Sequence, residues 1–274
     1  MPAARRDGRV VRRRSCRPDP EGGAIEHEAA SLEDAGMGRS DLHRRLGNRL
    51  YWHQRLHDAD DEPRNDSRWV AELRRWQAAR LASSFAHALD DPGRRPAAEF
   101  FLEHVYGDRD FTRRDADIAR TLPVMRRLLP EPLLETVADT LELGALSHAL
   151  DLHMSDALHA LAPRRRKLDA ALYAEAYVAT GRPQLRRRQI RLVAEVGAGF
   201  ARALRMRGVS ALLAFARGPA RLAGLSELQG FLERGYAAFD ALDDADAFVA
   251  EIERDEREVS RRLFAGHPSP YAGP

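Results

Sequence analysis

Residues 131–161 read EPLLETVADTLELGALSHALDLHMSDALHAL, and this stretch decides the fold. On a helix over these residues, large apolar side chains would cover most of the circumference. They are Leu133, Leu134, Val137, Leu141, Leu143, Leu146, Leu150, Leu152, Met154, Leu158 and Leu161. A helix that is apolar on nearly all sides is buried by other elements. We therefore expect a long central helix from about 131 to 161, with the rest of the chain packed around it.

The chain from residue 40 onward also has helical periodicity. Leu42, Leu46 and Leu50 fall on one face of a first helix, and a second helix follows that we expect to end at Pro92 and Pro96. No stretch alternates with the period of two that is typical of strands. Further helices are expected at about 167–179, 183–206, 208–216, 225–241 and 244–264. The sequence predicts an all-α protein, a compact multi-helix bundle with about ten helices and a long buried central helix.

One expected helix has local signals of its own. Thr112 and Asp115 have the spacing of a capping box, in which a hydroxyl and an acid satisfy backbone N–H groups at a helix start. An apolar stripe from Ile118 to Leu129 then runs straight through Pro123. A proline inside a helical pattern favours a kinked helix here.

The overall composition is that of an ordinary globular protein. Of the 274 residues, 44% are apolar and 31% charged, and the net charge is +2. No run of about 18 apolar residues could form a membrane-spanning helix. Cys16 is the only cysteine, so a disulfide framework is excluded and a cytoplasmic location is expected. Because Lys167 is the only lysine among 44 basic residues, we interpret the many arginines as uniform codon usage.

The first 36 residues differ from the rest. Residues 1–17 contain seven arginines, whereas residues 18–36 contain six acids and no Lys or Arg. Both blocks lack periodicity and large apolar groups, which is typical of a disordered segment. We expect 1–36 to be disordered or a mis-annotated N-terminal extension that precedes a true start at Met37. Residues 37–265 would form a single all-helical domain and 266–274 a flexible tail.

Acidic residues on the long helix suggest a metal site. Glu135, Asp139, Glu142 and His153 lie within about 40° of one direction on a helical wheel. Together with Glu103 they could supply oxygen and imidazole ligands for iron or manganese inside a bundle. The Glu-x-x-His pair of such sites is missing, however, and paired acids on helices are usually ion-paired. We therefore expect no cofactor and keep the iron or manganese site as an alternative.

Other chemistry has weaker support. The sequence contains no Gly-x-Ser-x-Gly, no phosphate loop and no dinucleotide fingerprint, so no catalytic residue is assigned. Two basic clusters could form a phosphate-binding ridge, but a solvated helix face is the favoured interpretation. The clusters are Arg164, Arg165, Arg166 and Lys167, and Arg182, Arg186, Arg187, Arg188 and Arg191.

The stretch FFLEHVYG at residues 100–107 carries a resemblance. Followed by DFTRRDAD, by LP and by the long ADTLELGALSHALD helix, it resembles a bacterial family named for its FFLEELY motif. His104 and Val105 stand where that motif has Glu and Leu. The family is uncharacterised, so the resemblance implies no reaction, and it leaves Glu103 as the better candidate for chemistry. Helical spacing alone predicts that Phe100 and Phe101 are both core residues.

These observations predict a soluble all-helical bacterial protein with a structural or interaction role. A metal-dependent enzyme built on the carboxylate and histidine stripe is one alternative. Arginine-mediated nucleic-acid binding is a second alternative, which the charge balance makes the less favoured one. A protein partner or a homo-oligomer stays open, and no membrane partner is expected.

Overall fold

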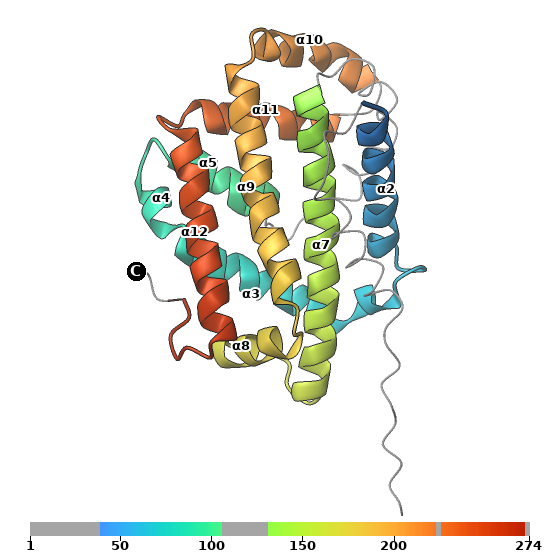
Figure 1. Cartoon of the computed structure of the whole chain (residues 1–274), viewed down its shortest axis with the longest axis vertical. Coiled ribbons are helices and arrows are strands. Elements are labelled where there is room, and N and C mark those ends of the chain that lie inside the picture. Colours follow the sequence, from blue (N-terminus) through green and yellow to red (C-terminus); the bar gives the residue numbers. More distant parts are fainter. Residues whose placement is uncertain (1–38, 106–130, 223–225, 272–274) are drawn as a thin grey trace, which may run out of the picture. The chain divides into compact units, whose positions relative to one another are not determined.

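The structure is a computed structural model that describes residues 39–105, 131–222 and 226–271 (Figure 1). The chain divides into two units, Met1–Gly36 and Met37–Pro274, and all described residues belong to the second unit. The predicted capping box at Thr112 and Asp115 and the kinked helix through Pro123 lie outside the described residues.

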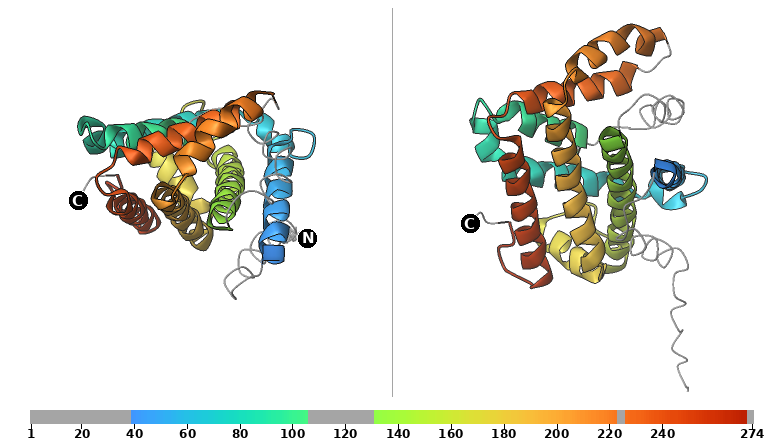
Figure 2. Two further views of the ribbon diagram at one scale, coloured as in Figure 1. Left: turned by 90° about the horizontal axis from the view of Figure 1, so that it is seen from above. Right: turned by 45° about the horizontal axis from the view of Figure 1, so that its top comes forward.

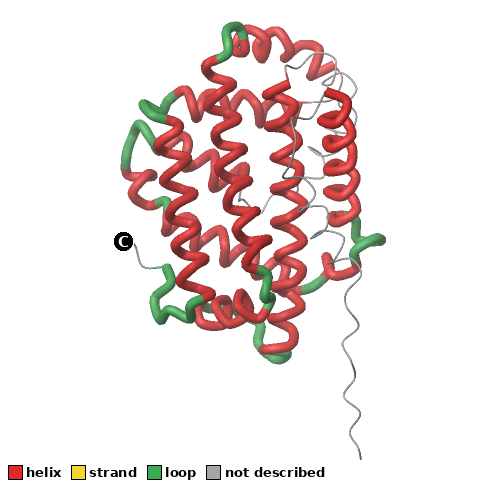
Figure 3. The backbone as a smooth tube through the Cα atoms, in the orientation of Figure 1, coloured by secondary structure: helices red, strands yellow, loops and turns green. Residues whose placement is uncertain are grey.

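Every regular element in the described ranges is helical, as Figure 3 shows, and the predicted all-α fold is confirmed. The described residues form ten α-helices: α2 (Arg39–His57), α3 (Arg68–Ser84), α4 (Ala86–Asp90), α5 (Arg95–Phe100), α7 (Glu131–Leu161), α8 (Ala170–Ala179), α9 (Pro183–Arg205), α10 (Val209–Leu222), α11 (Ser226–Asp240) and α12 (Ala245–Phe264). A 3-10 turn, η1 (Pro63–Asp66), precedes α3, and a π-helical turn, η2 (Phe101–Val105), continues α5. In these ranges no helix has the length and apolarity needed to cross a membrane.

The predicted central helix has the expected bounds, Glu131–Leu161, and the expected burial. Leu134, Leu141, Leu150 and Leu158 are each at most 2% exposed. α7 packs against α2, α3, α8 and α9, so neighbours cover it on several sides (Figures 1 and 2). Burial around its circumference explains why a helix this apolar is stable in the chain.

Two glycines bring α9 unusually close to its neighbours. Figure 1 shows α12, α9 and α7 side by side. A Cβ added at Gly199 would lie 2.3 Å from the Thr136 hydroxyl of α7, and one added at Gly197 would lie 2.6 Å from Val249 of α12. Positions two apart on a helix point about 200° apart, so the two glycines serve opposite faces. α9 therefore packs tightly on both sides.

Two expectations about helix ends need correction. The second helix ends at Ser84, before the predicted prolines, and Pro96 instead stands in the first turn of α5. That turn tolerates proline because its N–H groups have no partner within the helix. The helix expected at about 208–216 continues as α10 to Leu222. In the C-terminal segment, the Tyr271 ring lies 5.6 Å from that of Trp76 and 6.4 Å from that of Tyr173.

Phe100 and Phe101 are both core residues, as predicted, with 3% and 1% exposed. The Phe100 ring lies 5.4 Å from that of Phe231 on α11 and 5.7 Å from that of Phe200 on α9. The Phe101 ring lies 5.9 Å from that of Phe239 and 6.1 Å from that of Phe248. The α5–η2 segment is thus covered by α9, α11 and α12 and is a central element.

Phe101→Ala should lower the free energy of unfolding by about 3–5 kcal/mol, because it leaves a cavity among packed rings. Glu103→Gln should change it by less than about 0.5 kcal/mol, since the Glu103 side chain is 57% exposed. Urea unfolding of both variants, followed by circular dichroism, measures the difference. A harmless Phe101→Ala would contradict the central position of this segment.

Candidate functional site

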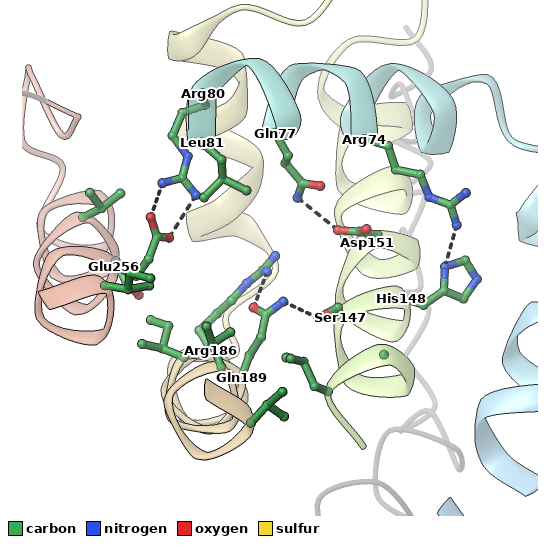
Figure 4. A pocket seen from close by; sticks show the side chains of 18 of the residues that line it. Arg74, Gln77, Arg80, Leu81, Ser147, His148, Asp151, Arg186, Gln189 and Glu256 are labelled. Carbon is green, nitrogen blue, oxygen red and sulfur yellow. Dashed lines mark hydrogen bonds and ion pairs between the residues drawn. The ribbon is translucent and has the colours of Figure 1, made fainter. Parts of the chain in front are cut away.

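The interior contains a cavity of about 500 Å³ (Figure 4). Its walls come from α2, α3, α7, α8, α9 and α12, with single residues from η1, η2, α11 and the C-terminal segment. Many of the lining residues are polar, which is unusual for a helical core. They include Arg74, Gln77, Arg80, Ser147, His148, Asp151, Arg186, Gln189 and Glu256. Buried polar groups need hydrogen-bond partners, and most of these side chains find theirs on the facing helix.

The wall between α3 and α7 is a ladder of hydrogen bonds. Gln77 Nε2 donates to Asp151 Oδ1 at 3.0 Å, and Arg74 Nη2 donates to His148 Nδ1 at 3.1 Å (Figure 4). Spacings of three and four residues put Arg74 and Gln77 on the buried stripe of α3 that also carries Leu81. These polar residues replace apolar ones at core positions and face the cavity.

His148 is held neutral. An arginine always donates, so Nδ1 is the acceptor, and the ring proton sits on Nε2, which donates to Asn65 Oδ1 at 2.6 Å. The ring also stacks on His57, which stacks on His53, with centroids 4.1 and 4.3 Å apart. Burial, with the nearby His57 and Arg74 charges, lowers the pKa of His148 to about 3. At neutral pH this ring is therefore a fixed hydrogen-bonding group and not a general base.

This neutral ring makes the fold sensitive to acid. The native pKa lies below the ordinary value of about 6.5, so the unfolded chain binds the proton more readily, and stability falls as pH drops below 6.5. Between pH 7 and pH 5 the loss from this ring alone should be about 2 kcal/mol. Urea unfolding at the two pH values should show that His148→Gln removes most of that loss.

The exposed His267 gives the matched control for this measurement. His267→Gln should keep the acid sensitivity of the wild type. An equal loss in the wild type and in His148→Gln would contradict the neutral, buried state of the His148 ring.

Arg186 is the most unusual group of the cavity. It lies on α9, is only 4% exposed, and its guanidinium stands 4.6 Å from the ring centroid of Tyr177. Nη1 donates to Gln189 Oε1 at 3.0 Å, and Gln189 Nε2 in turn donates to Ser147 Oγ on α7 at 2.8 Å (Figure 4). Nε and Nη2 have no hydrogen-bond partner. These two nitrogens form one edge of the guanidinium, the edge that fits two oxygens of a single anion.

The carboxyl of Asp151 is close enough to Arg186 for their charges to interact, but it accepts no hydrogen bond from Nε or Nη2. Burial raises the pKa of Asp151 above its ordinary value, and this outweighs the lowering by the charges of Arg186 and Arg74. Glu256 on the cavity wall, in contrast, has a direct arginine partner. The Glu256 carboxylate accepts hydrogen bonds from Arg80 Nη1 at 2.5 Å and from Arg80 Nη2 at 3.0 Å. Arg186 thus differs from Arg80 in having no carboxylate partner in the described part of the chain.

A family model described as Domain of unknown function (DUF8198) matches residues 56–270. The chain belongs to this family. The match covers every helix that lines the cavity except most of α2. The comparisons with curated proteins and with solved structures gave no match. The family agrees with the expectation of an uncharacterised family, while the FFLEELY resemblance itself stays a prediction.

Two residues of the predicted metal stripe, Asp139 and Glu142, form ion pairs with arginines. Arg49 on α2 pairs with both Asp139 and Glu142, and Arg188 on α9 binds Glu142 Oε1 at 2.7 Å. Glu103 is exposed, and its carboxylate lies 3.9 Å from the His104 ring, which instead faces the cavity. In the described ranges no cluster of three His, Cys, Asp or Glu side chains could hold a metal ion.

Helix geometry explains why the stripe does not converge. A helical wheel removes the rise along the axis, and 18 residues separate Glu135 from His153. That separation is about 27 Å on a straight helix, far beyond the reach of one ion. The iron or manganese interpretation therefore stays a prediction, and the arrangement of these carboxylates favours ion pairing between α2, α7 and α9.

The predicted basic ridge is split among several directions. Arg186 faces the cavity, Arg187 is exposed, and Arg188 pairs with Glu142 and Glu195. In the connector before α8, Arg165 pairs with Asp169 at 2.6 Å. Successive residues of a helix point about 100° apart, so the adjacent arginines at 186–188 point in different directions. The sequence signal for Arg186 was its place on the apolar stripe with Ile190 and Val193, which a count of neighbouring arginines does not register.

Proposed function

We propose that this protein binds a small organic anion in its interior cavity, with Arg186 as the principal anchor. The observation that carries the proposal is the unmatched Nε and Nη2 edge of a guanidinium that is only 4% exposed. A buried charged donor without an acceptor is destabilising by several kcal/mol. Such a group is explained by an acceptor that arrives from outside the chain.

The remainder of the cavity supports this proposal. A volume of about 500 Å³ lies within the range of small-molecule pockets, about 300–1,000 Å³. The Tyr271 hydroxyl is a second buried group without a hydrogen-bond partner, and it lines the same cavity. Burial raises the pKa of Tyr271 well above its usual range, so the phenol stays a neutral donor. The cavity therefore offers a bound molecule a second donor besides Arg186.

This function is one form of the interaction role expected from the sequence. The two alternatives have less support from the described residues. Asp139 and Glu142, which a metal-dependent enzyme would need, are bound by arginines. Nucleic-acid binding would need a continuous basic surface, whereas Arg186 points inward and Arg188 is paired. We keep a cytoplasmic location as part of the proposal.

Native mass spectrometry of the full chain as purified from cells tests the proposal. We expect the wild type to carry an excess mass of a small organic molecule, and Arg186→Met to lack it, because methionine fills the space without a charge. Arg187→Met changes the exposed neighbour on the same helix and should keep the excess mass.

Thermal unfolding of the same variants shows that the loss is not due to misfolding. Arg186→Met should melt at or above the wild-type temperature after ligand removal, because replacing a buried charge with an apolar group of similar volume is neutral or stabilising. The proposal fails if the wild type carries no excess mass, or if Arg186→Met carries the same one.

A further inference from the structure

The charges and the apolar walls of the cavity indicate the chemical class of its ligand. We infer that the ligand is a monocarboxylate with an apolar body, whose two carboxylate oxygens accept from the Nε and Nη2 of Arg186. This inference rests on the proposed function and refines it. A phosphate monoester is the main competitor, since the same guanidinium edge also fits two phosphate oxygens.

The charges on the cavity wall decide against a dianion. Asp151, Glu253 and Glu256 all line the cavity. Arg80 matches Glu256, and Arg257 outside the lining matches Glu253 with a 2.5 Å bond. The other charged side chains of the lining are Arg74, Arg186 and Asp151, which together carry +1 when Asp151 is ionised. A phosphate monoester carries about −1.5 to −2 at neutral pH, so it would leave excess negative charge in a poorly solvated space. A carboxylate carries −1, which the net +1 of Arg74, Arg186 and Asp151 balances.

The remaining walls define the body of the ligand. Tyr177 lies directly under the Arg186 guanidinium, and Tyr173 lies 5.9 Å from Tyr177. Aliphatic side chains of Leu81, Val193 and Ile252 complete the lining on α3, α9 and α12. Apolar and aromatic walls bind hydrocarbon by excluding water, and they offer few hydrogen bonds to a sugar or a polar chain. The carboxylate would thus be the polar end of a mostly apolar molecule.

Matched probes separate the two classes. Isothermal titration of the full, ligand-free chain at pH 7.5 uses phenylacetate, hexanoate and octanoate, each with its uncharged amide and with the phosphate ester of the same body. We expect at least one carboxylate to bind, its amide to bind at least 30-fold more weakly, and its phosphate ester at least 10-fold more weakly. Arg186→Gln should reduce carboxylate affinity at least 30-fold, while Arg187→Gln leaves it unchanged.

Asp151→Asn provides a second, independent readout of the charge argument. Removal of this carboxyl relieves the repulsion of a dianion more than that of a monoanion, so it should narrow the preference for carboxylate over phosphate at least threefold. The wild-type preference, its dependence on Arg186 and this narrowing together support the inference.

The results that would overturn the ligand class differ from those that would overturn the Arg186 anchor. Tighter binding of the phosphate esters, lost in Arg186→Gln, would overturn the carboxylate class and leave anion binding at Arg186 intact. Equal binding of amide and carboxylate, or carboxylate binding that persists in Arg186→Gln, would overturn both the class and the anchor. No binding of any carboxylate in the series would overturn the inference as well.

Discussion

The close approach of α9 to both α7 and α12 is the constraint on which the interior depends. Gly199 and Gly197 leave no room for a side chain at these contacts, so the rotation of α9 about its axis is fixed. A residue eleven positions away on a helix returns to within about 20° of the same direction. Arg188 therefore shares the side of Gly199, where it meets Glu142 of α7. Arg186 lies on the same side of α9 as Gly197, and its side chain faces the interior.

An inward arginine explains the polar character of the cavity. Gln189 and Ser147 accept or relay the hydrogen bond of one guanidinium nitrogen, and the Tyr177 ring covers one face of the group. The Arg74–His148 and Gln77–Asp151 pairs use the donors and acceptors of the opposite wall. The Nε and Nη2 edge of Arg186 has no hydrogen-bond partner among the described residues. Proteins retain such destabilising groups where function requires them, because stability and binding place opposite demands on a buried charge.

The sequence was sufficient for the fold and insufficient for the site. Helical periodicity located α7, α8, α9, α11 and α12 closely, because long apolar stripes have few alternative packings, but it ended α10 at about 216 instead of Leu222. It gave the wrong end for the second helix, since a proline is compatible with both a helix stop and a first turn. The site depends on which of several adjacent arginines turns inward, and that is fixed by packing at Gly197 and Gly199 rather than by local composition. Glu135 and His153 likewise point in one direction from α7 but lie far apart along its axis, so a helical wheel places them together although they are not neighbours.

The most direct test of this account is a crystal structure of the full chain with a bound carboxylate probe from the series above. The account predicts two carboxylate oxygens at hydrogen-bond distance from the Nε and Nη2 of Arg186, with the apolar body against Tyr177 and Val193. A structure in which the Asp151 carboxylate itself closes on that edge, with the probe bound elsewhere or absent, would contradict it.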